Sequence, residues 1–255
     1  MRRISLAALL VTSALALGAC QKKDGLDGVD PLTTGSTSPG SLKETAKLGG
    51  RWQSDPKNLQ LGLAYADQLK KLGQNDQQLQ VLGTLTQYHP NDQKLLTVYG
   101  RELVQAGQAD QAQTVLSKAI EAGSSDWKAY SAMGSTLDQQ GKYVPARDYY
   151  QRALKLSPGN AAVLNNLGMS YALEGNLKQA ETVLKDASAS PAGQKEPRLR
   201  QNLALVVGLQ GRFEEARQIA SADLPADQVE ENMAYLQKML AQPNTWQQLT
   251  DKPAG

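Results

Sequence analysis

Apolar residues near the C-terminal end of the chain recur with the period of an α-helix. Val229, Met233, Leu236 and Leu240 follow one another at spacings of 4, 3 and 4 residues, which places them on one face of a helical cylinder. The pattern begins shortly after Pro225. It predicts an amphipathic helix whose apolar face packs on the preceding part of the molecule.

Glycine residues divide the preceding segment at a nearly constant interval. The interval is 34 residues between the first four glycines and 36 before the last, at Gly73, Gly107, Gly141, Gly175 and Gly211. Each glycine is expected to end the first helix of an antiparallel pair, because glycine adopts the left-handed backbone conformation without a Cβ clash. The pairs are then predicted to start near Leu59, Gln93, Trp127, Ala161 and Pro197.

Small residues occupy the points where the two helices of each predicted pair must touch. The first helices supply Ala66, Gly100, Gly134, Gly168 and Ala204. The second helices supply Ala112, Ala146, Ala180 and Ala216, and the first pair departs from this rule with Gln78. Proline follows several second helices at the same phase, at Pro56, Pro90 and Pro158.

This combination of period and small residues resembles the tetratricopeptide repeat (TPR), a 34-residue helix–turn–helix unit. The resemblance implies an all-α fold, a TPR superhelix of about five helix-turn-helix repeats over residues 59–224. Residues 41–58, which open with the capping-box pair Ser41 and Glu44, are expected to form an N-terminal capping helix or degenerate repeat. Residues 225–255 would supply the C-terminal capping helix and tail.

Residues 1–19 have the composition of a secretory signal peptide. Arg2 and Arg3 precede an apolar run over residues 4–17, which is too short and too early for a membrane-spanning helix. The run ends in the sequence Leu-Gly-Ala-Cys at residues 17–20, which resembles a bacterial lipobox. Cys20 is therefore expected to carry a lipid anchor, with an ordinary signal peptide and an incidental thiol as the alternative.

The segment after the cysteine predicts a tether and a destination. Residues 20–40 are rich in Gly, Ser, Thr, Pro and Asp, a composition typical of a flexible linker. Gln21 stands where the retention rule for inner-membrane lipoproteins calls for Asp. By this resemblance we expect the protein at the outer membrane of a Gram-negative bacterium, facing the periplasm.

Charge and residue usage exclude several function classes. The chain has 27 basic and 25 acidic residues, a balance that offers no basic field for nucleic acid. Cys20 and His89 are its only cysteine and histidine, which excludes an internal disulfide and the common zinc sites. We therefore expect no catalytic residue, no metal, no cofactor and no small-molecule substrate.

A protein-binding groove is expected on the first helices, which line the concave face of TPR arrays. Position 6 of the fourth and fifth repeats is asparagine, Asn166 and Asn202, which resembles the asparagine ladder of peptide-binding TPR proteins. Solvated polar residues with no binding role are the alternative. The predicted groove residues are Asn165, Asn166, Met169, Leu173, Arg198, Gln201, Asn202 and Leu205.

The order of signal, tether, repeats and final helix resembles TadD, the TPR lipoprotein of the tight-adherence (Flp) pilus system. Two stretches are particularly similar to that family, residues 200–213 in the last repeat and residues 232–236, Asn-Met-Ala-Tyr-Leu. The resemblance implies a pilotin-like scaffold that binds the outer-membrane secretin or other pilus-assembly subunits.

Two other functions remain open at this point. One is a general periplasmic adaptor lipoprotein that recruits cell-wall hydrolases, proteases or outer-membrane assembly factors. The other is an enzyme decorated with repeats, although the repeats and caps leave no segment for a catalytic domain.

Overall fold

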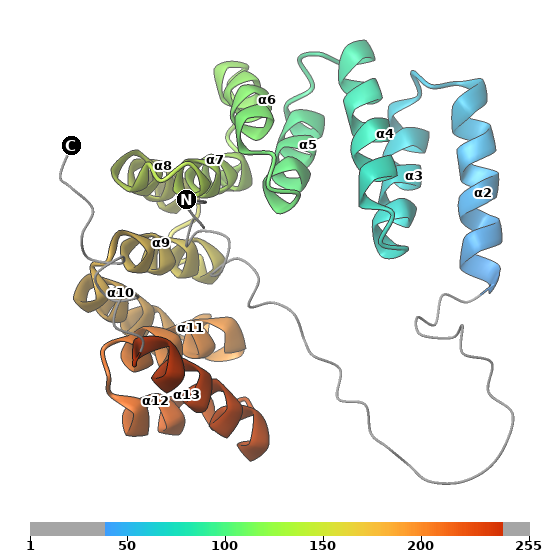
Figure 1. The fold of residues 1–255 in the computed structure, drawn as a ribbon. Coiled ribbons are helices and arrows are strands. Elements are labelled where there is room, and N and C mark those ends of the chain that lie inside the picture. Colours follow the sequence, from blue (N-terminus) through green and yellow to red (C-terminus); the bar gives the residue numbers. More distant parts are fainter. Residues whose placement is uncertain (1–38, 242–255) are drawn as a thin grey trace, which may run out of the picture.

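The computed structural model describes residues 39–241, which form a curved array of paired helices (Figure 1). The predicted signal peptide, Cys20, most of the predicted tether and the tail after residue 241 lie outside the described residues. The helices are α2 (Pro39–Ser54), α3 (Leu59–Lys71), α4 (Asn75–Tyr88), α5 (Gln93–Gln105), α6 (Ala109–Glu121), α7 (Trp127–Gln139), α8 (Tyr143–Leu156), α9 (Ala161–Glu174), α10 (Leu177–Ala189), α11 (Pro197–Leu209), α12 (Phe213–Ala220) and α13 (Ala226–Leu240), with the short 3-10 helix η1 (Gly193–Lys195) between α10 and α11.

Five consecutive helix pairs make up the array, and all five begin at the residues expected from the sequence. We number them repeats 1 to 5, from α3–α4 to α11–α12. The glycine between the two helices of each pair has a φ angle between 72° and 94°, which is the left-handed region expected for these glycines.

The predicted small residues let the paired helices approach closely. A Cβ atom added to Gly100 would lie 2.5 Å from Cγ of Leu116, and one added to Gly168 would lie 2.6 Å from Cγ of Leu184. In repeat 3 the equivalent glycine, Gly134, faces the ring of Tyr150. The small residue therefore leaves room for one large side chain from the second helix.

The first helices of repeats 1 to 4 begin with side-chain caps that recur at the repeat period and that the glycine pattern does not indicate. Asn58, Asp92, Asp126 and Asn160 each accept a hydrogen bond from a backbone N–H in the first turn of α3, α5, α7 and α9. Such caps satisfy amides that have no partner within the helix. The 34-residue spacing of these Asn and Asp residues could have revealed them.

The 36-residue step before the last glycine has a local cause between repeats 4 and 5. The chain there forms the 3-10 helix η1 before α11 starts at Pro197. Gly193 is buried in this turn, and a Cβ atom on it would clash with the carbonyl oxygen of Ala187. Two extra residues are thus accommodated without changing the helices on either side.

Capping helices cover both ends of the array. Helix α13 buries Val229, Met233 and Leu236, as the apolar spacing predicts. At the other end α2 begins at Pro39, two residues before the predicted start, so Ser41 lies inside the helix. Proline suits the first turn of a helix because its missing N–H is not needed there. No helix within residues 39–241 has the length and hydrophobicity to span a membrane.

The buried apolar side chains form two large clusters along the array. The first core cluster runs from Ala66 in α3 to Leu167 in α9. The second core cluster runs from Ala161 in α9 to Leu236 in α13. The two clusters therefore meet within α9, the first helix of repeat 4.

Candidate protein-binding groove

All eight predicted groove residues lie on α9 and α11, the first helices of repeats 4 and 5. Arg198 is exposed, and the other seven are partly buried. Met169 and Leu205 pack against the second core cluster, so only part of each side chain is open to a partner. Leu173 belongs to neither large cluster, which leaves it as the most available apolar contact of this set.

The position-6 asparagines of the groove hydrogen-bond to the preceding repeat across the repeat junctions. Nδ2 of Asn202 donates to Oδ1 of Asn165 over 2.7 Å, and Nδ2 of Asn166 donates to Oγ of Ser131 over 3.3 Å. In both cases position 6 of one repeat contacts position 5 of the repeat before it. The sequence predicts amides that are free to bind a peptide, whereas in the structure one N–H of Asn202 and one of Asn166 link neighbouring first helices.

Unused hydrogen-bonding capacity remains on these amides. An asparagine side chain offers two N–H donors and a carbonyl oxygen, and each bond above uses only one donor of Asn202 or Asn166. The carbonyl oxygens of Asn202 and Asn166 accept no hydrogen bond from residues 39–241, nor does the amide of Gln201 take part in one. An extended peptide could therefore both donate to and accept from this row.

The residues at position 6 of the groove are apolar in repeats 1 to 3. Position 6 there holds Ala64, Val98 and Ala132, so the asparagine row stops at repeat 4. Repeat 3 also carries a buried carboxylate, Asp138, which is 6% exposed and contacts α8 and α9. This half of the groove is thus built from different chemistry.

Asp138 accepts hydrogen bonds from two residues that are distant from it in the sequence. Oγ of Ser170 donates to its Oδ1 over 2.7 Å, and the hydroxyl of Tyr150 donates to its Oδ2 over 2.8 Å. The hydroxyl of Tyr150 also lies 3.1 Å from Oγ of Ser135. We call Ser135, Asp138, Tyr150 and Ser170 the Asp138 cluster.

The electrostatics of the Asp138 cluster are dominated by burial. Desolvation raises the pKa of Asp138 to about 6, although the hydroxyls of Ser170 and Tyr150 act in the opposite direction. Burial also raises the pKa of the Tyr150 phenol. A carboxyl with such a pKa changes its charge within a mildly acidic pH range.

An ion pair lies beside this cluster at the same junction. Nη2 of Arg147 on α8 is 2.8 Å from Oε2 of Glu174 on α9, and the guanidinium lies over the ring of Tyr171 at 4.5 Å. The positive charge of Arg147 lowers the pKa of Asp138, while the negative charge of Glu174 raises it. Repeats 3 and 4 are thus joined by a polar network.

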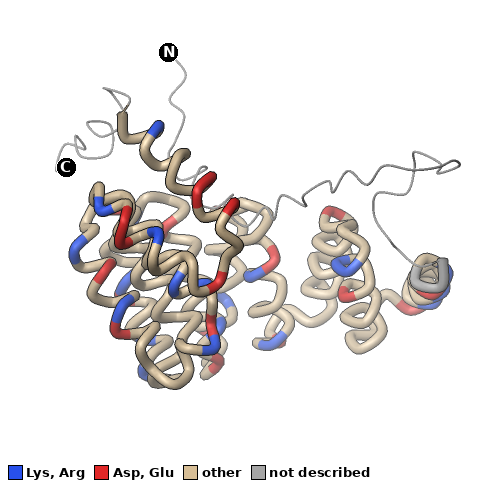
Figure 2. Tube along the Cα trace, turned by 90° about the horizontal axis from the view of Figure 1, so that it is seen from below, with Lys and Arg blue, Asp and Glu red and all other residues tan. Residues whose placement is uncertain are grey.

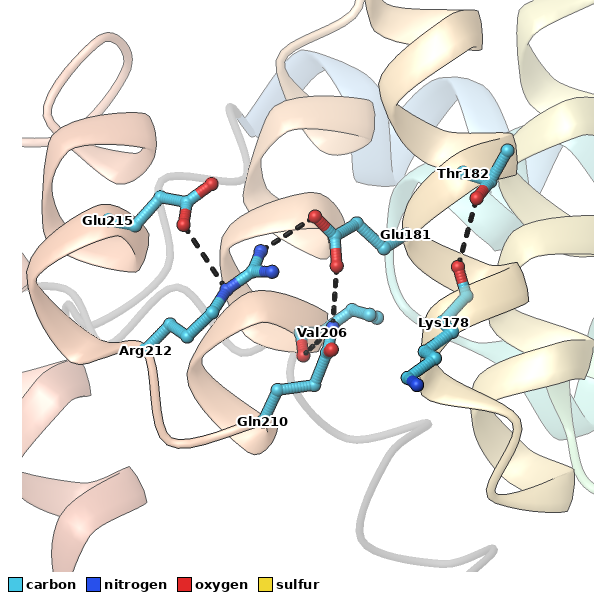
Figure 3. Close-up of polar contacts among 7 residues, drawn as sticks. All are labelled: Lys178, Glu181, Thr182, Val206, Gln210, Arg212 and Glu215. Atoms are coloured by element: carbon cyan, nitrogen blue, oxygen red, sulfur yellow. Dashed lines mark hydrogen bonds and ion pairs between the residues drawn. The ribbon is translucent and has the colours of Figure 1, made fainter.

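A second polar network joins repeats 4 and 5 on α10 and the α11–α12 turn (Figure 3). Glu181 accepts from Nη2 of Arg212 over 2.6 Å and from Nε2 of Gln210 over 2.8 Å. Nε of Arg212 is also 3.2 Å from Oε2 of Glu215. The bond from Arg212 lowers the pKa of Glu181. This network links the end of α11 and the α11–α12 turn to α10 of repeat 4.

Charges of both signs are interspersed along the described helices (Figure 2). Within the same residues no group of three or more His, Cys, Asp or Glu side chains could hold a metal ion.

The aromatic residues and the histidine have structural contacts. Tyr150 is 1% exposed. The guanidinium of Arg152 lies 4.8 Å from the ring of Tyr130 and 5.0 Å from that of Tyr149. Nε2 of His89 is 2.7 Å from the carbonyl oxygen of Lys57, which links two inter-repeat turns.

Comparisons with known proteins agree with this architecture. Family models described as tetratricopeptide repeat match residues 100–161 and residues 139–201. No curated protein sequence matches the chain. A tetratricopeptide repeat protein from Parabacteroides merdae has a similar structure, with a TM-score of 0.64, 14% identity and coverage of 78% of each chain.

Two further solved structures are similar in fold. PilW, described as a type IV pilus biogenesis factor, has a TM-score of 0.63 and 20% identity over 79% of this chain and 91% of its own. YrrB, described as a TPR protein with an unusual peptide-binding site, has a TM-score of 0.52 and 16% identity over 76% and 99%. The fold is a TPR superhelix, an architecture that presents an extended concave surface for protein–protein interaction.

Proposed function

We propose that this protein is an outer-membrane lipoprotein scaffold for assembly of a tight-adherence (Flp) pilus. In this proposal the groove on α9 and α11 binds a segment of the secretin or of another pilus-assembly subunit. The observation that carries it is the row of partly buried amides on these helices, where Asn202 and Asn166 are held in place and still offer their carbonyl oxygens.

The groove favours an extended segment with a carboxylate near one end. The amides suit peptide backbone groups, because each can donate and accept. Leu173 offers a partly exposed apolar contact, and Arg198 is exposed at the start of α11 without an ion pair among the described residues. A guanidinium without a counter-ion suits a carboxylate of the partner.

Two resemblances support the pilus part of the proposal. Residues 200–213 and 232–236 are similar to TadD, and both stretches lie in the last repeat and the C-terminal cap. The fold is also similar to that of PilW, a type IV pilus biogenesis factor.

The proposed mechanism combines an anchor with a weak groove. Acyl chains on Cys20 would hold the scaffold on the periplasmic face of the outer membrane, and residues 21–38 would connect it to α2. Anchoring raises the effective concentration of a membrane-bound partner. A modest affinity in the groove would then be sufficient to localise assembly subunits.

Affinity capture of the tagged, lipidated protein from detergent-solubilised envelopes of its native bacterium tests this function. We expect mass spectrometry to find a secretin and other pilus-assembly subunits. Recovery of cell-wall hydrolases, proteases or outer-membrane assembly factors without a secretin would instead favour a general adaptor lipoprotein.

A matched pair of variants locates the binding site in the same experiment. Arg198→Ala and Lys94→Ala both remove an exposed cation at position 2 of a repeat, in repeats 5 and 2 respectively. Neither side chain has an ion pair within residues 39–241. Arg198→Ala should lower secretin recovery several-fold and Lys94→Ala should not. Equal recovery with both variants would place the binding site elsewhere on the array.

A further inference from the structure

The junction between repeats 3 and 4 is mainly apolar along the first half of α9, where Asn166 makes one hydrogen bond to Ser131, and polar along the second half. Val163 and Leu167, in the first half of α9, extend the first core cluster across the junction. Further along the helix, Ser170 and Glu174 contact repeat 3 through Asp138 and Arg147 instead.

The corresponding contact has different chemistry at the other junctions. Asp138 and Ser170 stand at position 12 of one repeat and position 10 of the next. Between repeats 1 and 2 these positions hold Lys70 and Glu102, an ion pair of 2.6 Å whose lysine is 41% exposed. Between repeats 4 and 5 the same positions hold Ala172 and the buried Val206.

Asp138 is therefore a buried carboxylate without a cation in hydrogen-bond contact among the described residues. Its two oxygens are satisfied by the hydroxyls of Ser170 and Tyr150. Burying an ionised carboxylate has a large desolvation cost, which neutral hydroxyl donors offset only in part.

The Asp138 cluster can be hydrogen-bonded in either protonation state. When Asp138 is ionised, Tyr150 donates to it. When Asp138 carries a proton, its O–H can donate to the Tyr150 oxygen, and the Tyr150 O–H can turn to Ser135, whose Oγ lies 3.1 Å away. The cluster loses no hydrogen bond when Asp138 is protonated. The two protonation states therefore differ mainly in the free-energy cost of burying the charge of Asp138.

We propose that the polar end of the junction between repeats 3 and 4 is a pH-responsive latch, which opens more readily when Asp138 is ionised and is held closed when Asp138 takes up a proton. Opening separates α9 from α7 at Ser170 and pivots about the apolar contacts of Val163 and Leu167. The latch lies where the asparagine row of the groove meets repeat 3, so its state sets how the two halves of the groove are aligned.

The charged groups that act on the pKa of Asp138 lie on α8 and α9. Arg147 on α8 favours the ionised form of Asp138, and Glu174 on α9 opposes it. Tyr150 on α8 is kept neutral by burial. Helix α5 meets this end of α7 at Val104, whose carbonyl oxygen accepts from Nε2 of Gln139.

The direction of the pH effect follows from the burial of Asp138. Its pKa is about 6 in the closed latch, against an ordinary value of 3.8, so the closed form binds the proton more tightly than the open form. Closure is therefore favoured as the pH falls through this range. Lowering the pH from about 7.5 to about 5 should reduce the opening constant about ten-fold.

Hydrogen exchange of the full-length protein, followed by mass spectrometry at these two pH values, tests the latch. After correction for intrinsic exchange rates, protection over residues 131–139 and 166–174 should rise about ten-fold at the lower pH. Protection over residues 79–88 in α4 serves as the internal reference. In Asp138→Asn the pH response should disappear, because the amide keeps the shape of the carboxyl and cannot titrate.

A matched control separates the latch from general charge effects. Asp148→Asn removes an exposed carboxylate from α8 and should keep the wild-type response. Should Asp138→Asn fail to fold, Ser170→Ala gives a second test, because it removes a hydrogen bond that lowers the pKa of Asp138. Its response should then move to higher pH. The proposal is overturned when the wild-type protein shows no pH response in these segments, or when Asp138→Asn responds as the wild type does.

Discussion

Asn202 and Asn165 are hydrogen-bonded to each other across the junction of repeats 4 and 5, with 2.7 Å between Nδ2 and Oδ1. The same offset between repeats recurs one junction earlier, where Asn166 donates to Ser131. The groove amides are thus oriented before any partner arrives. Prior orientation lowers the entropy that a partner must overcome on binding.

The Asn202–Asn165 bond predicts a measurable coupling in stability. Asn202→Ala and Asn165→Ala should each lower the free energy of unfolding by about 1 kcal/mol, because each removes a partly buried hydrogen bond. The double variant should lose less than the sum of the two. Urea unfolding followed by circular dichroism gives all the required values.

This coupling affects how groove variants are interpreted. A loss of partner binding in Asn202→Ala would combine a lost contact with a loosened junction. Gln201→Ala is the matched comparison, since Gln201 lies beside Asn202 and takes part in no hydrogen bond within residues 39–241. Strictly additive losses in the double variant would show that the Asn202–Asn165 bond contributes nothing in solution.

Most of the fold could be predicted from the sequence because a repeat array is held by contacts between neighbours. The glycine period and the small residues predict all five helix pairs. The glycines are needed for the left-handed turn between the helices, and the small residues are needed where the helices touch. Helix α2 begins at Pro39, two residues before the predicted Ser41, because a proline in the first turn starts the helix ahead of the polar capping pattern.

The candidate site was predicted less completely because its chemistry depends on pairs of distant residues. Asp138 and Ser170 are separated by 32 positions, and neither is unusual in its own helix. When the repeats are aligned, Asp138 of repeat 3 stands at the position of Val104 in repeat 2 and Ala172 in repeat 4. Its carboxylate therefore differs from the apolar residues of these repeats. The burial of that carboxylate, and hence its pKa, needs the three-dimensional packing of α7, α8 and α9.

Glycine at the helix crossing of repeat 2 predicts a second stability effect. In Gly100→Ala the new Cβ would lie 2.5 Å from Cγ and Cδ2 of the fully buried Leu116. Overpacking of this kind costs about 1–3 kcal/mol. Urea unfolding should show a loss in this range.

Gly50 provides the matched control for this substitution. It is also helical, in α2, and a Cβ atom there would meet nothing within 4 Å. Gly50→Ala should therefore stabilise α2, by about 0.5–1 kcal/mol, because alanine has the higher helix propensity. Equal effects of the two substitutions would contradict the tight helix crossing at Gly100.

The C-terminal cap depends on an ion pair between α11 and the segment that precedes α13. Nε and Nη2 of Arg200 lie 2.7 Å and 2.5 Å from the two carboxylate oxygens of Asp223, whose side chain is 10% exposed. Asp223→Ala should cost about 2 kcal/mol, because it leaves Arg200 without its charged partner. Hydrogen exchange should show faster exchange over α13.

Glu231→Ala is the control, because it removes an exposed side chain from α13 itself. The free energy of unfolding of this variant should stay within about 0.5 kcal/mol of the wild type. A similar loss in both variants would argue against a specific role for the ion pair.

Tyr150 predicts a loss of stability that depends on pH. In Tyr150→Phe the hydroxyl that donates to Oδ2 of Asp138 is removed, and because that bond lowers the pKa of Asp138, the carboxyl should become harder to ionise. At about pH 7.5, where wild-type Asp138 is ionised, the variant should lose about 1–3 kcal/mol. At about pH 4.5 the carboxyl is protonated and no charge is left without its donor, so the loss should be smaller. Urea unfolding at the two pH values measures the difference, with Tyr149→Phe as a control whose effect should not depend on pH. An equal loss at both pH values would mean that Tyr150 acts only through packing, and that the charge of Asp138 does not depend on its hydroxyl.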